Sequence, residues 1–200
     1  MPDPHDIEVL ARETVFQGYF RVERIRLRHR LYEGDMGPEI VREVFERGHA
    51  VAVLPYDPVR DEVVLIEQFR VGPFARGDVP WQLEIIAGII EAGEDTLEVA
   101  HREAAEEADL ELEELVPILD YYSSPGASTE HIAVFCARVD ATTAGGVHGL
   151  AEEGEDIRVV VMGFADTMAA LRAGRIMASP AIIALQWLAL NRDDLRQRWG

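Results

Sequence analysis

Charged and apolar side chains alternate strictly from Arg24 to Arg28, which is the period of a strand with one buried and one exposed face. The adjacent charges of Glu23 and Arg24 interrupt this alternation and predict a bulge there. Strand-like composition covers residues 13–16, 19–32 and 40–45. Three antiparallel strands of this size bury little apolar surface, so we expect them to pack on the rest of the chain or on a second subunit.

The chain from His49 onward has enough apolar residues for a core of its own. Helices are predicted to begin near Asp95, Asp166 and Ser179, and residues 72–80, with two prolines and two glycines, are predicted to form a loop. Because strands and helices do not alternate regularly, the pattern favours an α+β fold with a mixed sheet, in two domains at 1–47 and 48–200. Apolar runs bounded by turn residues predict strands at 49–55, 62–68, 83–90, 115–122, 132–139 and 157–162.

Acidic residues dominate the charge of the chain: 37 Asp and Glu against 19 basic residues give a formal net charge of −18. Such a surface repels nucleic acid and anionic membranes, so we expect neither as a partner. All nineteen basic residues are Arg and none is Lys, which excludes the Walker-type phosphate loop, Schiff-base lysines and Ser–Lys mechanisms. An enzyme that acts on phosphate compounds would therefore need local arginines or bound cations.

The single cysteine, Cys136, lies in an apolar run, where we expect a buried strand position rather than a catalytic thiol. One cysteine forms no intrachain disulfide, which fits a reducing compartment. The first residues are acidic and contain proline, unlike a signal peptide, and no apolar run approaches ~18 residues. We therefore expect a cytoplasmic protein without a membrane-spanning helix.

An acidic cluster lies on the predicted helix after Asp95, which forms a capping pattern with Glu98. Glu103, Glu106 and Glu107 are spaced at i, i+3 and i+4, so their side chains share one face of this helix. Three carboxylates this close repel one another, and a hard divalent cation would relieve that repulsion. From the cluster alone, a solvated acidic face is the alternative.

The spacing around this cluster resembles the Nudix box. That pattern is a Gly, five residues, a Glu, seven residues, Arg-Glu, two residues and Glu-Glu, and the matching residues here are Gly88, Glu94, Arg102, Glu103, Glu106 and Glu107. Two positions depart from it: Ala104 is small for an aliphatic position, and Asp109 replaces a final Gly at the helix C-cap. The resemblance implies the Nudix fold, a mixed β-sheet sandwiched between α-helices, preceded here by a small antiparallel β domain.

Motifs outside the box resemble the ADP-ribose pyrophosphatase branch of this family. They lie at residues 67–70, 124–126, 148–157 and 184–188. Pro125 stands fifteen residues after Leu110, as does a proline that marks ADP-ribose users in the family. The resemblance implies Mg²⁺-dependent hydrolysis of ADP-ribose to AMP and ribose 5-phosphate, with Mn²⁺ as a second candidate metal. One alternative is a hydrolase of another nucleotide sugar such as GDP-mannose. A second alternative is a non-catalytic ADP-ribose sensor, but all four box glutamates are intact, which argues against a sensor.

The resemblance also implies a role for each matching residue. Arg102 and Glu94 would fix the geometry of the carboxylates, and Arg70 would contact the diphosphate, which suits a bidentate guanidinium. A surface ion pair is the alternative for Arg70. The catalytic base would be Glu153 or Glu155, in a Gly-flanked loop able to close over the substrate. A disordered acidic loop is the alternative. The metal ligands would be the backbone carbonyl of Ala87 and the side chains of Glu103, Glu106, Glu107 and Glu155.

Recognition of the nucleotide is implied to involve a homodimer formed through the N-terminal domain. Adenine would stack on Tyr19, with Arg42 and Glu43 contributed by a partner subunit. A simple packing role is the alternative for Tyr19. The ribose–phosphate side of the substrate would be lined by Ser124, Pro125, Gly126 and Glu130.

Overall fold

The computed structural model describes residues 6–200, apart from the side chain of Glu153. The chain forms two compact units. The first runs to His49 and also contains Tyr122–His131, and the second comprises Ala50–Tyr121 and Ile132–Gly200. No helix in the described part of the chain is long and apolar enough to cross a membrane.

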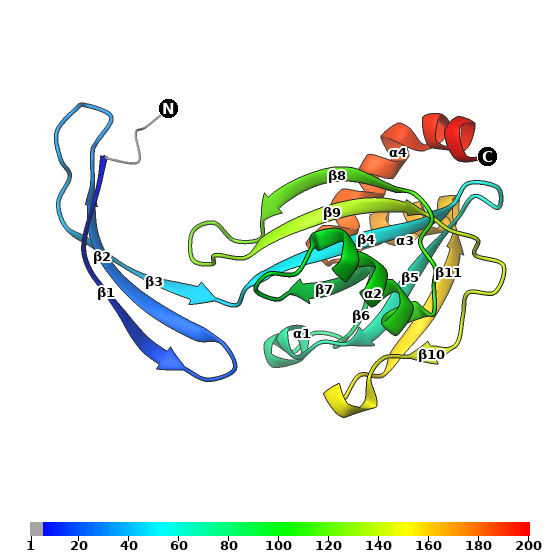
Figure 1. Ribbon diagram of the computed structural model, residues 1–200, viewed down its shortest axis with the longest axis horizontal. Helices are drawn as coiled ribbons and strands as arrows, with labels where there is room; N and C mark the ends of the chain where they lie inside the picture. The colour runs from blue at the N-terminus through cyan, green and yellow to red at the C-terminus, as the bar shows by residue number, and fades with distance from the viewer. Residues whose placement is uncertain (1–5) are drawn as a thin grey trace. The chain divides into compact units, whose positions relative to one another are not determined.

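The first unit contains the antiparallel sheet expected from the sequence, with the strand order β1-β2-β3 (Figure 1). Most of its residues are exposed or half-buried, as expected for three strands without a helix layer. Its strands are β1 (Ile7–Gln17), β2 (Arg21–His29) and β3 (Ile40–Glu46).

The bulge predicted at Glu23 and Arg24 does not occur in β2. The pairing instead shifts between Thr14 and Phe16 on the neighbouring strand β1, while β2 stays regular. The sequence was misleading because Glu23 is a buried carboxylate on the inner face of the strand, where Arg12 Nε donates to its Oε2 at 2.5 Å. An ion pair, and not a break in the strand, accounts for the charged residue at this position.

A mixed sheet of eight strands forms the centre of the second unit, with the order β10-β11-β5-β4-β9-β8. Strand β6 pairs with β5 and β7 with β4; β4 and β9 run parallel, and β5 is antiparallel to both β6 and β11. The strands are β4 (His49–Asp57), β5 (Glu62–Phe69), β6 (Trp81–Glu84), β7 (Ile86–Ile90), β8 (Leu115–Tyr122), β9 (His131–Arg138), β10 (Val147–His148) and β11 (Ile157–Gly163).

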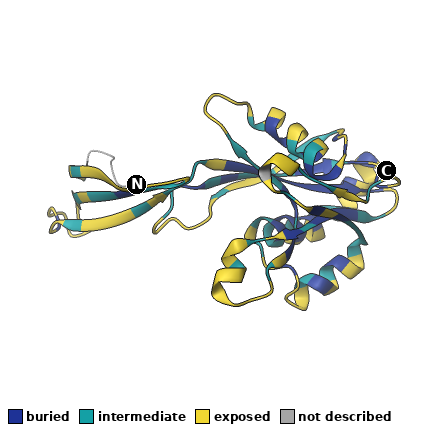
Figure 2. Ribbon diagram, turned by 90° about the horizontal axis from the view of Figure 1, so that it is seen from below, coloured by how far each residue is buried: buried dark blue, intermediate teal, exposed yellow. Residues whose placement is uncertain are grey.

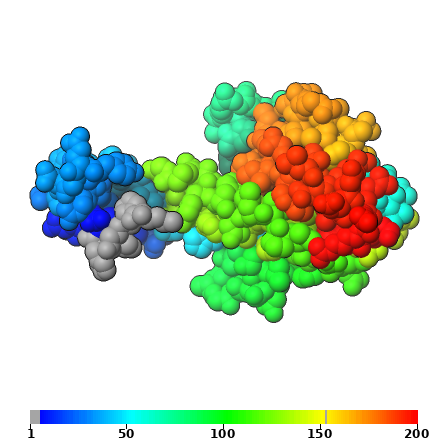
Figure 3. Space-filling model, turned by 90° about the horizontal axis from the view of Figure 1, so that it is seen from above, coloured from blue at the N-terminus to red at the C-terminus, as the bar shows by residue number. Residues whose placement is uncertain are grey.

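Helices cover both faces of this sheet, so the predicted sandwich is confirmed. The helices are α1 (Val71–Arg76), α2 (Thr96–Ala108), α3 (Phe164–Arg172) and α4 (Ser179–Trp199), with a 3₁₀ turn at Ala151–Glu153. Alternate residues of β4 enter two cores: Val51 and Val53 pack in the core that contains α2, and Ala52 and Leu54 in the core that contains α4. Figure 2 shows the buried strands between the helix layers, and Figure 3 shows α3 and α4 (orange and red) side by side.

Three local expectations change in the structure. Residues 72–80, predicted as a loop, begin within the short helix α1, which ends at Gly77 in the left-handed conformation. The apolar run 83–90 divides after Glu84 into β6 and β7, because the chain passes from pairing with β5 to pairing with β4. The predicted cap Ser179 is already helical, and its hydroxyl lies 2.9 Å from the Tyr121 hydroxyl.

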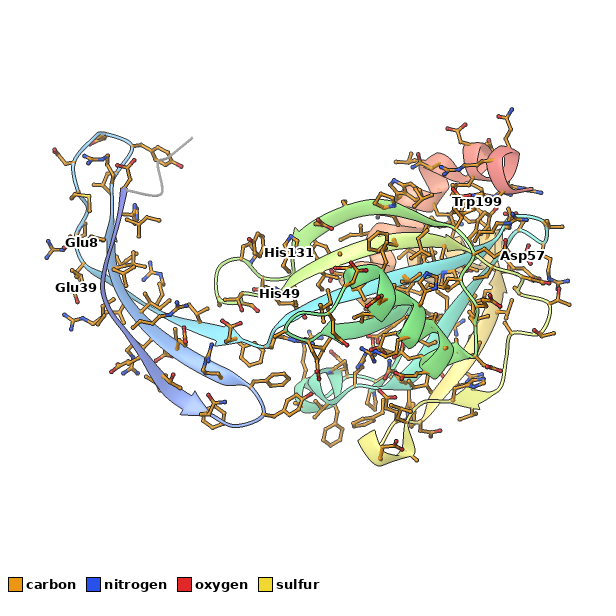
Figure 4. The ribbon with its side chains drawn as sticks, in the orientation of Figure 1. Glu8, Glu39, His49, Asp57, His131 and Trp199 are labelled. Atoms are coloured by element: carbon orange, nitrogen blue, oxygen red, sulfur yellow. The ribbon has the colours of Figure 1, made fainter. Side chains whose placement is uncertain are left out.

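A hydrogen-bonded carboxylate closes the hairpin between β4 and β5. Asp57, labelled in Figure 4, accepts from the backbone N–H groups of Val59 and Arg60 at 2.9 Å each through Oδ1. Its Oδ2 accepts from the Ala141 N–H at 3.0 Å, which ties the hairpin to the chain after β9. Asp57 is almost completely buried, so these bonds satisfy a carboxylate that would otherwise be costly to bury.

Candidate active site

Helix α2 is fixed at both ends by aspartates. Asp95 is the N-cap and accepts from the backbone N–H groups of Leu97 at 2.9 Å and Glu98 at 3.3 Å. Asp109 ends the helix in the left-handed conformation with φ 50°, the C-cap geometry expected where the box pattern has Gly. Buried Ala100 and Ala104 hold one side of the helix against the sheet.

The first glycine of the box lies directly against a box glutamate. A Cβ on Gly88 of β7 would stand 2.0 Å from Glu103 Oε1, so only glycine leaves room for this carboxylate beside the strand. The preceding residue, Ala87, donates its backbone N–H to Glu107 Oε2 at 3.1 Å. Strand β7 therefore positions two of the carboxylates of α2.

Glu107 is buried, with 3% of its surface exposed, and burial raises its pKa to about 8 against the opposing hydrogen bond from Ala87. The negative charges of Glu103 and Glu155 raise the pKa of Glu107 further, and the positive charge of Arg70 lowers it. Burial also raises the pKa of Glu103, which Arg102 opposes. The site thus gathers carboxylates whose ionised forms are destabilised in the absence of a compensating cation.

Arg102 lies among the carboxylates of the box. Its Nη1 is 2.8 Å from Glu103 Oε1 and 3.1 Å from Glu106 Oε2, the residue one turn further along α2. Its Nη2 is 3.9 Å from Glu94 Oε2, and that oxygen accepts from the Glu91 N–H at 2.8 Å. Arg102 and Glu94 therefore lie where they can orient the carboxylates of α2.

The loop after β10 brings a fourth carboxylate to the cluster. Gly149 donates its N–H to the Glu106 carbonyl at 3.1 Å, which ties the loop to α2. Glu155 Oε2 accepts from the Leu150 N–H at 3.0 Å, and its charge raises the pKa of both Glu103 and Glu107. The side chain of Glu153, the other candidate base, lies outside the described residues.

The chemistry of these side chains fits a hard divalent cation, which prefers carboxylate and carbonyl oxygens. Glu103, Glu106, Glu107 and Glu155 supply such oxygens, and two of them have pKa values raised by burial and mutual repulsion. Among the side chains that the structure describes, no three His, Cys, Asp or Glu groups are already grouped as a ligand set. Arg102 holds the oxygens of Glu103 and Glu106 in this arrangement.

Arg70 follows β5 directly and forms an ion pair, its alternative role from the sequence, with a partner that the sequence did not predict. Its Nε and Nη2 both lie 2.8 Å from one oxygen, Oε2, of Glu84 on β6. In the sequence, Glu84 stands out only as a single carboxylate within the mostly apolar residues 81–90. This feature alone does not indicate that Glu84 pairs with Arg70. The charge of Arg70 lowers the pKa of Glu107, so its guanidinium lies within electrostatic reach of the box carboxylates.

The residues expected to recognise adenine all lie in the first unit. Tyr19 lies between β1 and β2, is 86% exposed, and stacks edge-on against Phe20 with ring centroids 4.7 Å apart. Arg42 on β3 is exposed and donates to the Val41 carbonyl at 2.8 Å. Glu43 pairs with Arg24 at 2.9 Å.

The residues expected on the ribose–phosphate side also belong to the first unit. The turn between β8 and β9 contains Ser124, Pro125 and Gly126, and the Ser124 carbonyl accepts from the N–H groups of residues 127 and 128. Glu130 is buried and lies 3.0 Å from Arg47 Nη1. Next to it, His49 and His131 stack edge-on with centroids 6.3 Å apart (Figure 4). The candidate metal residues and Arg70, by contrast, belong to the second unit.

Comparison with known proteins finds similarity over almost the whole chain. The NUDIX domain model matches residues 46–179. The chain is 48% identical over 196 residues to an ADP-ribose pyrophosphatase of Escherichia coli K12, covering 98% of this chain and 94% of the relative. It is 41% identical over 197 residues to an ADP-ribose pyrophosphatase of Haemophilus influenzae, covering 97% and 91%.

More distant similarities have the same extent. The chain is 32% identical over 192 residues to a GDP-mannose pyrophosphatase of Cronobacter sakazakii, covering 93% of this chain and 96% of the relative. A crystal structure described as an ADP compounds hydrolase superposes with a TM-score of 0.73 at 23% identity, covering 97% of this chain and 96% of the other. This structural match supports the α+β fold with its mixed sheet.

Proposed function

The chain belongs to the Nudix family, and from this premise we propose that it hydrolyses the diphosphate of ADP-ribose to give AMP and ribose 5-phosphate. The observation that carries the proposal is the box itself: Glu103 and Glu107 are held against β7 at Gly88 and Ala87, with Arg70 within electrostatic reach. Relatives named ADP-ribose pyrophosphatase, at 48% and 41% identity over nearly the full chain, support the choice of substrate.

The family implies a divalent metal, and we propose Mg²⁺, with Mn²⁺ as the second candidate. The residues that would hold it are the carbonyl of Ala87 and the side chains of Glu103, Glu106, Glu107 and Glu155. When bound, such a cation neutralises diphosphate charge and polarises phosphorus toward attack by water. A protein of net charge −18 needs this compensation to bind an anionic substrate.

In the proposed reaction one water oxygen attacks a phosphorus of the diphosphate, and the bridging P–O bond breaks. The proton of that water goes to a carboxylate of the loop, for which Glu153 is our first candidate and Glu155 the second. Support for this loop as the source of the base comes from Glu155, whose charge acts on Glu103 and Glu107. Arg70 is proposed to bind diphosphate oxygens, and Arg102 with Glu94 to orient the box carboxylates.

We further propose that residues 1–47 act as a dimerisation domain, with residues 48–200 as the hydrolase domain. Strands β1 to β3 leave several large apolar side chains exposed, among them Val9, Phe16 and Val41, which supports association with a second copy. Adenine would stack on Tyr19, with Arg42 and Glu43 of the partner subunit beside it. Ser124, Pro125, Gly126 and Glu130 would line the ribose–phosphate side.

Product analysis tests the reaction directly. Purified protein is incubated with Mg²⁺ and either ADP-ribose or GDP-mannose, beside a Glu106→Gln/Glu107→Gln variant. AMP and ribose 5-phosphate from the parent only, formed faster than GDP-mannose is cleaved, would support the proposal. Faster cleavage of GDP-mannose would favour the second candidate substrate, which the 32% identical relative suggests. Binding of ADP-ribose without cleavage would favour a sensor.

A further inference from the structure

We propose that Glu84 is a positioning residue that sets the orientation of Arg70 toward the diphosphate; this inference rests on the proposed function. A guanidinium has two edges that each carry two donors, one formed by Nε with Nη2 and one by Nη1 with Nη2. Glu84 Oε2 takes the first edge, with both nitrogens at 2.8 Å. The second edge is left for two oxygens of a phosphate, the geometry that a bidentate contact requires.

The two partners differ in exposure in the way that this role demands. The side chain of Glu84 is 14% exposed, whereas that of Arg70 is 43% exposed. The carboxylate is therefore held within the sheet while the guanidinium remains accessible to a ligand. A half-exposed ion pair contributes little to stability, so the main effect of Glu84 is to orient the exposed guanidinium of Arg70.

Backbone pairing fixes both ends of the contact. Glu84 lies opposite Ile66 in the antiparallel pairing of β5 and β6. Arg70 follows the last residue of β5, and its N–H donates to the Pro80 carbonyl at 2.8 Å. With both backbones fixed in one sheet, the side chain of Arg70 has few alternative arrangements that keep the contact with Glu84.

Glu84 also keeps Arg70 away from the box carboxylates. The guanidinium is close enough to Glu107 to affect its ionisation, and Arg102 already pairs with Glu103 and Glu106. If Glu84 were absent, Arg70 would be free to pair with these carboxylates and to compete with the cation for them. Loss of Glu84 should therefore weaken both substrate binding and the response to Mg²⁺.

The test compares the parent with Arg70→Ala, Glu84→Ala, Glu84→Gln and the Arg70→Ala/Glu84→Ala double variant. Initial rates are measured over a range of ADP-ribose and Mg²⁺ concentrations, and thermal unfolding shows that each variant is folded. We expect Glu84→Ala to raise KM roughly tenfold with a much smaller change in kcat, and Glu84→Gln, which keeps an acceptor oxygen, to recover part of the loss. On the Arg70→Ala background, Glu84→Ala should add little further effect.

A neighbouring ion pair provides the matched control. Glu67 on β5 pairs with Arg158 on β11 at 2.6 Å, but it lies opposite Leu83, on the sheet face that packs toward α4. Glu67→Ala should leave KM unchanged. Free guanidinium ion should also restore activity to Arg70→Ala and not to the double variant, because only Glu84 would hold it in the vacated position.

The outcomes separate this inference from the function on which it rests. If Glu84→Ala costs as much on the Arg70→Ala background as in the parent, Glu84 acts independently of Arg70 and the inference is wrong. If the parent does not cleave ADP-ribose, the proposed function fails. Because nothing is then cleaved, calorimetric binding of ADP-ribose to the same variants in the presence of Mg²⁺ still tests the coupling between Glu84 and Arg70.

Discussion

The side chain of Glu103 on α2 packs directly against Gly88 on β7: a Cβ on Gly88 would lie 2.0 Å from Glu103 Oε1 and 2.2 Å from Glu103 Cγ. Such separations are far inside van der Waals contact, so the glutamate occupies the volume that any side chain at Gly88 would need. The fixed interval between these two residues in the box therefore has a steric basis. With this number of residues between Gly88 and Glu103, the chain turns back so that α2 packs its carboxylates against β7.

Substitution of this glycine should damage the metal site without unfolding the domain. Gly88→Ala displaces Glu103 from β7, and we expect the apparent affinity for Mg²⁺ or the activity to fall roughly 10- to 100-fold, as when the support of a metal ligand is lost. The measurement is the Mg²⁺ dependence of ADP-ribose hydrolysis. Gly72→Ala is the control, since nothing lies within 4 Å of its added Cβ. An unchanged Mg²⁺ dependence in Gly88→Ala would contradict the steric argument.

Glu107 should matter for the metal and not for the stability of the metal-free fold. It is buried and accepts a hydrogen bond from the Ala87 N–H, and burial disfavours its ionised form. Without Mg²⁺, burial keeps much of this carboxyl protonated near pH 7, and Glu107→Gln replaces it with an uncharged amide of the same size. The melting temperature of the metal-free variant should therefore be at least as high as that of the parent. Activity should fall at least ~100-fold, because several kcal/mol of charge stabilisation depend on the cation.

Thermal unfolding with and without Mg²⁺ checks the expectation for Glu107. A ligand that binds only the folded state raises the melting temperature, so Mg²⁺ should stabilise the parent and have little effect on Glu107→Gln. Equal stabilisation of both proteins by Mg²⁺ would show that Glu107 is not a metal ligand.

Features with local signals could be predicted from the sequence. Helix α2 was predicted with its cap at Asp95 and its end at Asp109, because a cap is decided by residues within one turn of the helix end. Apolar runs bounded by turn residues likewise predicted most strands of the second unit. The box spacing brought Glu103, Glu106 and Glu107 together because one helix carries all three.

Features that depend on pairing between distant segments could not be predicted. The division of residues 81–90 into two strands reflects a change of partner from β5 to β4, which leaves no mark in the periodicity. The contact between Arg70 and Glu84 depends on the register of β5 and β6, and no spacing rule gives that register. Helix α1 was missed because Pro73 and Gly77, which suggest a loop, are also compatible with the start and end of a short helix.

Asp61 and Arg192, which lie outside the box in the sequence, form an ion pair. This pair predicts a pH-dependent contribution to the free energy of unfolding. Asp61 Oδ1 accepts from Arg192 Nε at 2.7 Å and from the Tyr56 hydroxyl at 2.8 Å. The hydrogen bond from Arg192 holds the pKa of Asp61 below its ordinary value, with a further contribution from Tyr56 and against the effect of burial. The folded state therefore binds this proton less readily than the unfolded state does, and stability falls as the carboxylate becomes protonated.

Asp61→Asn isolates this charge. Asp61 has φ 60°, a left-handed conformation that Asn also adopts readily, so the substitution adds little backbone strain. Above about pH 4, where the unfolded carboxyl is ionised, we expect the variant to be less stable by about 1–3 kcal/mol. The difference should shrink as the pH falls through the lowered pKa. Urea unfolding between pH 3 and 8 measures it, and a difference that stays constant below pH 4 would contradict the ion-pair explanation.

Tyr19 tests whether the first unit recognises the base. Because its ring is 86% exposed and contacts Phe20 edge-on, Tyr19→Ala should leave folding intact and remove a stacking surface worth about 1–3 kcal/mol for one base. We expect KM for ADP-ribose to rise about 5- to 100-fold with little change in kcat, because the base lies far along the substrate from the reacting phosphorus. Tyr32, fully exposed in the same unit, gives the matched control Tyr32→Ala. Equal KM values for the two variants would remove Tyr19 from the substrate site and leave it the packing role that its contact with Phe20 describes.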